Sequence, residues 1–414
     1  MSADSQILFN NNLEYTLPVP SSVVVNKTKK RNYFQNRTYS SGQTMVCTLN
    51  TASDFIDLAN SSLVVKLKLT STNVNPFGCT FGLGSAMNMV ENIRIFHRSG
   101  TQFTNTQAMR VYRVVDDRNC ESENWFKTIG LNMGYDLPVG EIDSTTPEIT
   151  CVIPLKKLHP FFDPEGGVLA PAPLVAGARV EIDLASLGNI FFDNQEVNTS
   201  PPTDYSVEDI YFDLESVSLM DSAQASINTN AQKRSLEYLY HDIFTSRNAT
   251  PSNSSAINVD INKSVSYATK VFSVIQTDGQ QNDVQSEGYS TPYKAGKWWY
   301  HLGSLQYPAV QQVDSDKVAY ANNLLTWDKN SGKCGERGQS EMTLTEYKSN
   351  YGAYSASLEM DTALALSALP VTSSRTLRFE AQLDNPVANN STTIVFMNYL
   401  SSARVTLTSC KVDI

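Results

Sequence analysis

The chain has 414 residues with a formal net charge of −10, of which 41% are apolar, 10% aromatic and 18% charged. That length corresponds to two or three domains of ordinary size, and the apolar content suffices for buried cores. The acidic balance argues against a protein that coats nucleic acid over a large surface, because such proteins are basic. No apolar run approaches the ~20 residues of a membrane helix, so no membrane-spanning segment is expected. The first residues lack the basic and apolar regions of a secretory signal peptide.

Residues 1–44 are predicted to form an N-terminal arm that precedes the first clear strand. Four cations lie within five residues of this arm, at Lys27, Lys29, Lys30 and Arg31. A charge run of this kind is usually a solvated loop. Contact with nucleic acid or another acidic partner, and a nuclear localisation signal, remain open as functional interpretations.

The first half of the chain is dominated by strands. The segment Ser62–Thr70 alternates apolar and polar residues, which is typical of a strand with one buried and one wet face. Asn92–Phe103 is predicted to be a hairpin with Gly100 in its turn. Thr106–Asp117 favours a short helix that Thr106 would cap. Further strands are predicted at Cys151–Leu155, Arg179–Leu184 and Tyr211–Leu219.

The second half repeats this order of elements. A β segment at Trp298–Tyr307 precedes a second helix, Asp314–Lys329, whose start at Asp314-Ser-Asp316 suits a cap. Alternating strands follow at Leu377–Leu383 and Thr393–Tyr399, and the chain closes on Arg404–Thr408. We therefore predict an internal duplication. The polar stretch Asp221–Gln232 would link a first domain, 45–225, to a second, 226–414.

The sequence offers no catalytic constellation. The four histidines, at positions 97, 159, 241 and 301, are too far apart for a metal-binding motif, and no nucleophile elbow or phosphate-binding loop is present. None of the six cysteines lies within four residues of another, which favours reduced and partly buried thiols over a zinc or redox pair. We therefore predict that the protein is not an enzyme and takes neither a cofactor nor a metal.

The densest aromatic cluster is Trp298-Trp299-Tyr300. In a strand, Trp298 and Tyr300 share one face, and packing in a core explains them better than an exposed platform for sugars. A carbohydrate-binding β-sandwich protein and a viral fibre or receptor-binding protein remain the alternative functions.

Several segments together resemble the double jelly-roll major capsid proteins of eukaryotic double-stranded DNA viruses, in particular those of polinton-like viruses and virophages. No single motif is diagnostic, and the order and spacing over residues 45–410 carry the resemblance. The segments are Phe55–Thr70, Val90–Gly100, Ile153–Leu158, Phe161-Phe162, Leu169–Pro171, Ala176–Ile182, Leu302–Pro308, Ser357–Glu359, Leu364–Ser367, Ser374–Arg378 and Asn398–Leu400.

This resemblance implies an all-β fold of two eight-stranded antiparallel barrels, with a few short helices in loops. It implies homotrimers with a pseudo-hexagonal outline that tile an icosahedral shell around a double-stranded DNA genome. The implied partners are further copies of the chain, a penton protein and minor or cement proteins, and the implied location is the virion. In such a shell, Lys27, Lys29, Lys30 and Arg31 would face inward and make a weak contact with the genome.

Overall fold

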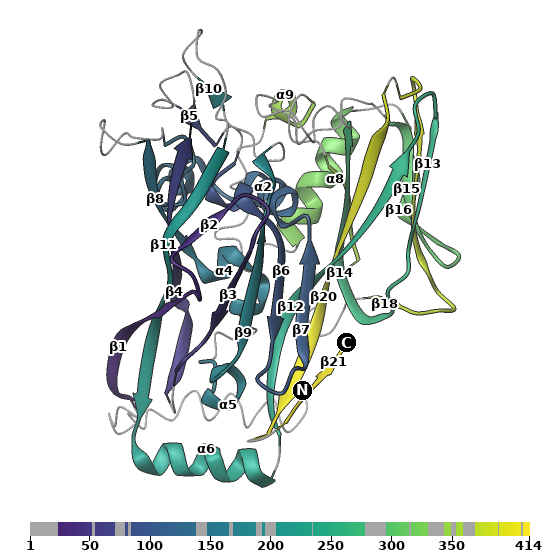
Figure 1. The fold of residues 1–414 in the computed structure, drawn as a ribbon. Helices are drawn as coiled ribbons and strands as arrows, with labels where there is room; N and C mark the ends of the chain where they lie inside the picture. The colour runs from purple at the N-terminus through teal and green to yellow at the C-terminus, as the bar shows by residue number, and fades with distance from the viewer. Residues whose placement is uncertain are drawn as a thin grey trace.

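The computed structural model describes residues 24–51, 54–70, 79–81, 84–137, 147–164, 169–187, 193–194, 204–233, 235–277, 295–313, 316–329, 343–348, 353–358, 369–387, 389–406 and 409–414. The expected helix start at residues 314–315 and the segment 364–367 lie outside these ranges. The described residues form two β-barrels that stand side by side (Figure 1).

The first barrel consists of two facing sheets. Sheet I has the strand order β1-β11-β4-β8, with β2 paired to β11, and sheet II has the order β3-β9-β6-β7. A short pair, β5 and β10, lies at one end of the barrel. The strands are β1 (Val24–Tyr33), β2 (Thr38–Ser40), β3 (Thr44–Thr48), β4 (Phe55–Thr70), β5 (Cys79–Thr80), β6 (Val90–Phe96), β7 (Gln102–Gln107), β8 (Glu148–Pro154), β9 (Arg179–Leu184), β10 (Asp193–Asn194) and β11 (Asp204–Leu219).

The second barrel is built in the same way. Sheet III has the order β12-β20-β14-β17, with β18 paired to β14 and β21 to β20, and sheet IV has the order β13-β19-β15-β16. The strands are β12 (Leu236–Thr250), β13 (Ala256–Ile261), β14 (Val265–Thr277), β15 (Ala295–Leu302), β16 (Leu305–Val313), β17 (Tyr354–Ser357), β18 (Leu369–Val371), β19 (Leu377–Leu383), β20 (Ser391–Val405) and β21 (Cys410–Asp413).

The two barrels have one topology. If the eight principal strands of each half are numbered along the chain, both halves contain one sheet in the order 1-8-3-6 and one in the order 2-7-4-5. That arrangement is the jelly roll, in which two Greek-key sheets pack face to face. The predicted all-β double jelly roll and the duplicated order of elements are therefore confirmed.

The amphipathic strands form where the alternation predicts them. In β4, Val65, Leu67 and Leu69 are buried, and the lysines between them are half-buried on the outer face of sheet I. The hairpin β6–β7 is also confirmed, and Gly100 in its turn has a φ of +88°, a value that glycine tolerates best. The predicted strands Arg179–Leu184 and Leu377–Leu383 match β9 and β19 residue for residue.

Two strands of sheet III are buried on both faces. In β20, Val395, Met397 and Tyr399 belong to the core of the second barrel, whereas Ile394 and Phe396 pack with the core of the first. The alternation expected for Thr393–Tyr399 is therefore wrong, although the strand itself is present and extends to Val405. The physical reason is that sheet III lies between two cores, so neither face meets water.

The helices occupy the connections between strands. They are α2 (Met109–Cys120), α3 (Glu123–Trp125), α4 (Leu155–Leu158), α5 (Ala172–Val175), α6 (Asp221–Lys233), α8 (Asp316–Lys329) and α9 (Leu344–Glu346), with shorter turns η1 (Ala86–Met89), η2 (Phe126–Gly130) and η3 (Pro160–Phe162). Both predicted helices exist. The expected cap at Thr106 is wrong, because Thr106 still belongs to β7 and the N-cap is Ala108, which has a left-handed φ of 53° and makes no side-chain cap.

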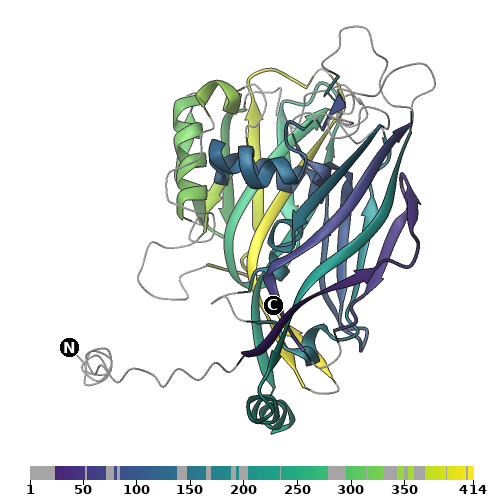
Figure 2. The ribbon, with the colours of Figure 1, turned by 90° about the vertical axis from the view of Figure 1, so that its left-hand side faces the viewer.

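The stretch predicted to be a polar linker is a helix. Helix α6 lies across the base of the molecule and connects β11 of the first barrel to β12 of the second (Figures 1 and 2). Alanine, glutamine and lysine in this segment favour a helix, and Asp221 in the first turn complements its dipole. The proposed domain boundary at 225/226 falls within this helix.

The basic run is part of the first sheet. Lys27, Lys29, Lys30 and Arg31 all lie in β1, which pairs with β11 along Val24–Tyr33. The expectation that this run precedes the first strand is therefore wrong. Residues 24–44 contain β1, β2 and the first residue of β3, so they belong to the barrel and not to an arm. The strand was missed because its consecutive polar residues hide the alternation.

Candidate functional site: the junction between the two barrels

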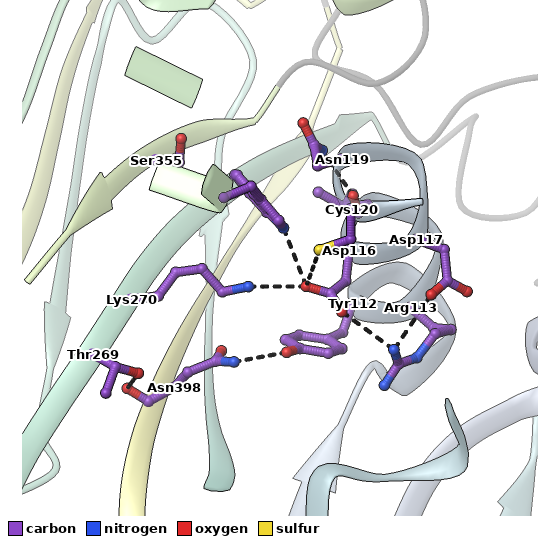
Figure 3. Close-up of polar contacts among 12 residues, drawn as sticks. Tyr112, Arg113, Asp116, Asp117, Asn119, Cys120, Thr269, Lys270, Ser355 and Asn398 are labelled. Atoms are coloured by element: carbon purple, nitrogen blue, oxygen red, sulfur yellow. Dashed lines mark hydrogen bonds and ion pairs between the residues drawn. The ribbon is translucent and has the colours of Figure 1, made fainter. Parts of the chain in front are cut away.

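Helix α2 lies between the barrels and contacts both of them. It leaves β7 of sheet II, and its side chains reach strands β14 and β20 of sheet III (Figure 3). Its exposed surface is small, since most of its residues are buried, including Arg113, Asp116 and Asp117. A helix with charged residues that is buried all round must pair those charges within the protein.

Asp116 joins three elements through its carboxylate. It accepts hydrogen bonds from Lys270 Nζ in β14 at 2.9 Å and from Trp327 Nε1 in α8 at 3.1 Å. Arg113, one turn earlier in α2, donates to its other oxygen at 3.2 Å. The Lys270 ammonium also lies 4.8 Å from the centre of the Trp327 ring, which adds a cation–π contact.

Asp117 points toward the first barrel and completes the ionic network. It accepts from Lys157 Nζ in α4 at 2.8 Å and from the Tyr135 hydroxyl at 2.9 Å. Lys157 also bonds Glu121, just beyond α2. The network thus contains three cations and three carboxylates, namely Arg113, Lys157, Lys270, Asp116, Asp117 and Glu121. The three positive and three negative formal charges cancel, so each buried ion has a partner of opposite sign.

The electrostatics of α2 favour the charged forms. Burial alone would raise the pKa of Asp116, but attraction to Lys270 and Arg113 outweighs it and holds that pKa below its usual range. Burial likewise opposes the charge of Arg113, and Asp117 and Asp116 raise its pKa above the ordinary value. Both groups therefore stay ionised near neutral pH.

A polar and aromatic contact lies beside the ions. Asn398 Nδ2 in β20 donates to the Tyr112 hydroxyl at 2.7 Å. The Tyr112 ring packs against Phe272 and Phe396, with ring centres 5.5 Å apart in each case. A chain of amide and hydroxyl groups, Asn119, Asn323 and Ser355, continues the contact from α2 through α8 to β17.

A second buried cluster joins the barrels lower down, where β7 meets β12. Asp242 in β12 accepts from the hydroxyls of Thr104 and Tyr399, each at 2.5 Å. His159 Nδ1 accepts from the Phe161 backbone N–H at 3.0 Å, so Nε2 carries the proton and donates to Thr106 Oγ1 at 2.9 Å. That hydroxyl in turn donates to the Ile243 carbonyl at 3.2 Å.

Burial shifts the pKa values of both His159 and Asp242 in this cluster. Burial, assisted by the charge of Arg113, lowers the pKa of His159 from 6.5 to about 3, so the ring is neutral. Burial also raises the pKa of Asp242 above its ordinary value, against the hydrogen bonds from Thr104 and Tyr399.

A cavity of about 240 Å³ opens next to α2. Its walls combine both signs of charge with aromatic rings, and they are Tyr112, Arg113, Asp116, Glu121, Trp125, Ile129, Lys156, Lys157, Pro160, Asp163, His241, Thr269, Lys270 and Asn398. The cations among them are largely paired with the carboxylates described above. In the part of the chain that the structure describes, no cluster of three or more His, Cys, Asp or Glu side chains is placed to hold a metal ion.

Three further residues of potential chemical reactivity, His97, Cys47 and Cys151, are buried in the first barrel. His97 is buried and bonds Ser99 and the Pro173 carbonyl. Cys47 and Cys151 are free, buried thiols, and burial raises the pKa of each to about 12, which suppresses thiolate reactivity. None of the helices in the described ranges is long and apolar enough to cross a bilayer.

The residues of the basic run do not converge on a pocket. Lys27 lies 3.2 Å from Glu215, Lys29 lies 3.3 Å from Asp213, and Lys30 lies 2.5 Å from Asp54. Arg31 stacks over the Tyr211 ring at 4.8 Å. The three lysines are half-exposed, so these pairs are screened by solvent, yet each cation has an acidic neighbour in the same barrel.

The aromatic cluster of the second barrel is confirmed as core. Trp298 and Tyr300 are buried, and Trp299 on the opposite face donates to Glu380 at 2.8 Å. No sugar platform is therefore formed by these three residues.

The sequence did not reveal the junction. Asp116 and Asp117 end the predicted helix Thr106–Asp117, where carboxylates ordinarily serve as solvated or capping groups, and no local pattern marks Lys270 as their partner. The only available signal was the charge inside the apolar pattern of Thr106–Asp117, which a surface helix would not place among valines and a tyrosine.

Solved structures with the same architecture come from viruses. The chain superposes on a chain of the PBCV-1 virus capsid with a TM-score of 0.62 and 11% identity, covering 97% of this chain and 99% of that one. For the Sputnik virophage the TM-score is 0.60 at 12% identity, covering 96% and 90%. For the Faustovirus major capsid protein it is 0.55 at 8% identity, covering 97% of each chain. No family model and no curated protein matches the sequence.

At identities this low, the likeness defines the fold. The chain has the double jelly-roll fold of viral major capsid proteins, over nearly its whole length and theirs. The predicted resemblance is thereby confirmed at the level of the fold.

Proposed function

We propose that the chain is a viral major capsid protein, a structural protein and not an enzyme. The observation that carries this proposal is the pair of barrels of identical topology, fixed to each other by a buried network and similar in fold to capsid proteins from end to end. A shell protein needs rigid, repeated units with defined side faces, and two fused barrels supply them. The proposed location is the virion.

The contact between the two barrels of one chain suggests how three copies would form a ring. The outer face of sheet III packs against α2, which belongs to the preceding barrel. If the same relation is repeated between chains, the contact is head-to-tail and closes when six barrels complete a turn. Three chains then form a homotrimer with a pseudo-hexagonal outline.

The remaining features of the shell are part of the same proposal. Trimers would tile an icosahedral lattice around a double-stranded DNA genome, with a penton protein at the vertices and minor or cement proteins between capsomers. The likeness in fold to the PBCV-1 virus capsid and the Sputnik virophage supports assembly into a shell, whereas the penton and cement partners are proposed from the family resemblance of the sequence alone.

Contact between Lys27, Lys29, Lys30 and Arg31 and the genome stays a prediction. Pairing with Glu215, Asp213 and Asp54 in the same barrel reduces the positive potential that these residues can offer to phosphate. Any such contact would therefore be weak and sensitive to salt.

The alternatives have less support. A carbohydrate-binding protein would expose an aromatic platform, and the densest aromatic cluster is turned into the core. A fibre or receptor-binding protein remains compatible with a β-sandwich, but it does not explain why two complete barrels are joined side by side.

The test is the assembly state of the purified full chain. Light scattering is expected to give three times the chain mass, and negative-stain images are expected to show particles with a hexagonal outline. A stable monomer at micromolar concentration that binds glycans would contradict the proposal.

A further inference from the structure

A row of apolar side chains crosses the outer face of sheet I. The strand register places Tyr33, Tyr211, Val64 and Val152 side by side across β1, β11, β4 and β8. We call these four residues the open row. Tyr33 is 62% exposed and Val152 is 37% exposed, and the two residues between them are half-buried.

Charged pairs flank the open row. Lys27 and Lys29 are paired with Glu215 and Asp213, and Lys66 lies 2.5 Å from Glu148. The Arg31 guanidinium lies over the open row itself, 4.8 Å from the centre of the Tyr211 ring. A partner that covers this face would therefore meet an apolar and aromatic centre that carries one arginine, inside a rim of paired charges, a composition that protein interfaces commonly have.

The equivalent row of the second barrel is already covered. In sheet III, the corresponding strands are β12, β20, β14 and β17, and their register aligns Thr245, Phe396, Phe272 and Ser355. Tyr112 of α2 packs on the two phenylalanines of this covered row. In the first barrel the same position on the sheet has no such helix among the described residues.

Helix α8 is the counterpart of α2. Helix α2 lies between β7 and β8 in the first barrel, and α8 lies between β16 and β17, the corresponding strands of the second. Asn323 and Trp327 on one face of α8 are buried toward α2 and β14. The other face exposes an apolar stripe at spacings of three and four residues, formed by Val318, Ala321 and Leu325, with Val318 47% and Leu325 53% exposed.

We propose that the apolar stripe of α8 in one copy docks on the open row of sheet I in the next copy. This inference rests on the proposed function and specifies which surfaces close the ring. The contact within one molecule is the basis of this proposal, because α2 of the first barrel packs on the covered row of sheet III in the same way. Because the two surfaces differ, the contact is heterologous, and each copy uses its stripe on one neighbour and its open row on the other.

The experiment separates the two surfaces. One variant changes the stripe, Val318→Asp with Leu325→Asp, and a second changes the edge strands of the open row, Tyr33→Glu with Val152→Glu. All four residues are exposed, so the monomer is expected to stay folded, which circular dichroism and thermal unfolding would check. The matched control is Met220→Asp, an exposed apolar residue (44%) outside both surfaces.

Each double variant is expected to be monomeric, and Met220→Asp is expected to behave as the unchanged chain. A mixture of the two double variants is expected to give pairs of one copy each and nothing larger, since only one intact stripe can meet one intact row. Native mass spectrometry distinguishes the mixed pair from either monomer by its mass.

The outcomes are distinguishable from failure of the proposed function. If the unchanged chain is monomeric, the capsid proposal itself fails. If the unchanged chain is trimeric and the stripe variant is also trimeric, only this interface is wrong. Monomers alone in the mixture would likewise overturn it, because the two surfaces would not meet.

Discussion

Asp116 connects α2 to β14 and α8 through Lys270 and Trp327. Replacing Asp116 by Ala leaves Lys270 and Arg113 buried with one carboxylate fewer. Removing one partner of a buried ion pair typically costs about 3–5 kcal/mol. We therefore expect Asp116→Ala to lower the free energy of unfolding by about that amount, measured by urea denaturation.

Asp213→Ala is the matched control for this prediction. Asp213 also pairs with a lysine, Lys29, but on the outer face of sheet I, where the lysine is half-exposed. Such pairs contribute at most ~1 kcal/mol. Equal losses for the two variants would show that the junction gains nothing from its buried network.

His159 gives the junction a dependence on pH. Its pKa is about 3 in the folded protein against an ordinary 6.5, so the unfolded chain takes up a proton first as the pH falls. The resulting stability is fully present above pH 6.5 and is lost progressively toward pH 3. Protonation would also place a hydrogen on Nδ1, which accepts from the Phe161 N–H.

The prediction is that His159→Gln flattens the stability curve over this range. Urea midpoints measured between pH 7 and pH 4 are expected to fall more steeply for the unchanged chain than for the variant. Asp242 lies 3.7 Å from His159 Nε2 and also titrates in this cluster, but its raised pKa adds stability as the pH falls, which is the opposite direction to the effect expected from His159. Parallel curves would show that His159 does not titrate in this way.

The basic run allows a direct test of genome contact. Lys27→Gln with Lys29→Gln removes two cations but places no new acid beside Glu215 or Asp213, unlike charge reversal. If the run contacts phosphate, the variant is expected to retain less DNA, with a logarithmic salt slope shallower by about 2. Unchanged assembly together with unchanged DNA retention and salt slope would remove the contact.

At the scale of elements, β20 shows how position in the molecule decides the pattern of a strand. Phe396 faces the junction and packs on Tyr112 and Phe272, whereas the residues on either side of it face the second barrel. Truncating a buried phenylalanine costs about 3–5 kcal/mol. Phe396→Ala is therefore expected to destabilise the protein by this amount and to speed hydrogen exchange in α2.

Phe379→Ala is the comparison for this element. Phe379 is equally buried but lies in the core of the second barrel, beside Tyr300. It is expected to destabilise to a similar degree, with faster exchange in β15 and β19 and little change in α2. If both variants affect α2 alike, the junction and the barrel core are one cooperative unit.

The elements also show what a local pattern can and cannot predict. The amphipathic strands β4, β9 and β19 follow from alternation, because each has one face in a core and the other in water. Strand β1 was missed because an exposed edge strand carries few apolar residues, and lysines suit such an edge. Helix α6 was missed because its polar sequence has no apolar stripe to place against a core.

At the scale of the whole molecule, the two barrels have the same topology but different outer faces. Sheet III is apolar toward α2 and is covered within the chain, whereas sheet I presents the open row and its paired charges to the outside. Because both barrels belong to one chain, the contact between sheet III and α2 is present in every molecule. The equivalent face, on sheet I, is the one proposed to contact α8 of another copy. We expect this asymmetry to set the order of assembly, with the folded monomer preceding the ring.

The sequence by itself determined the all-β class, the duplicated order of elements, most strands of the first barrel, the strands β15, β16, β19 and β20 of the second, and the absence of a recognisable catalytic motif. These follow from periodicity and turn residues, which act over a few neighbours. Only the tertiary structure decided that Asp116, Lys270 and Trp327 meet, that the basic run lies in a paired strand, and that one row is covered and the other open. The physical reason is distance along the chain. Residues more than 150 positions apart, such as Asp116 and Lys270, leave no local pattern, and their contact exists only once the two barrels pack side by side.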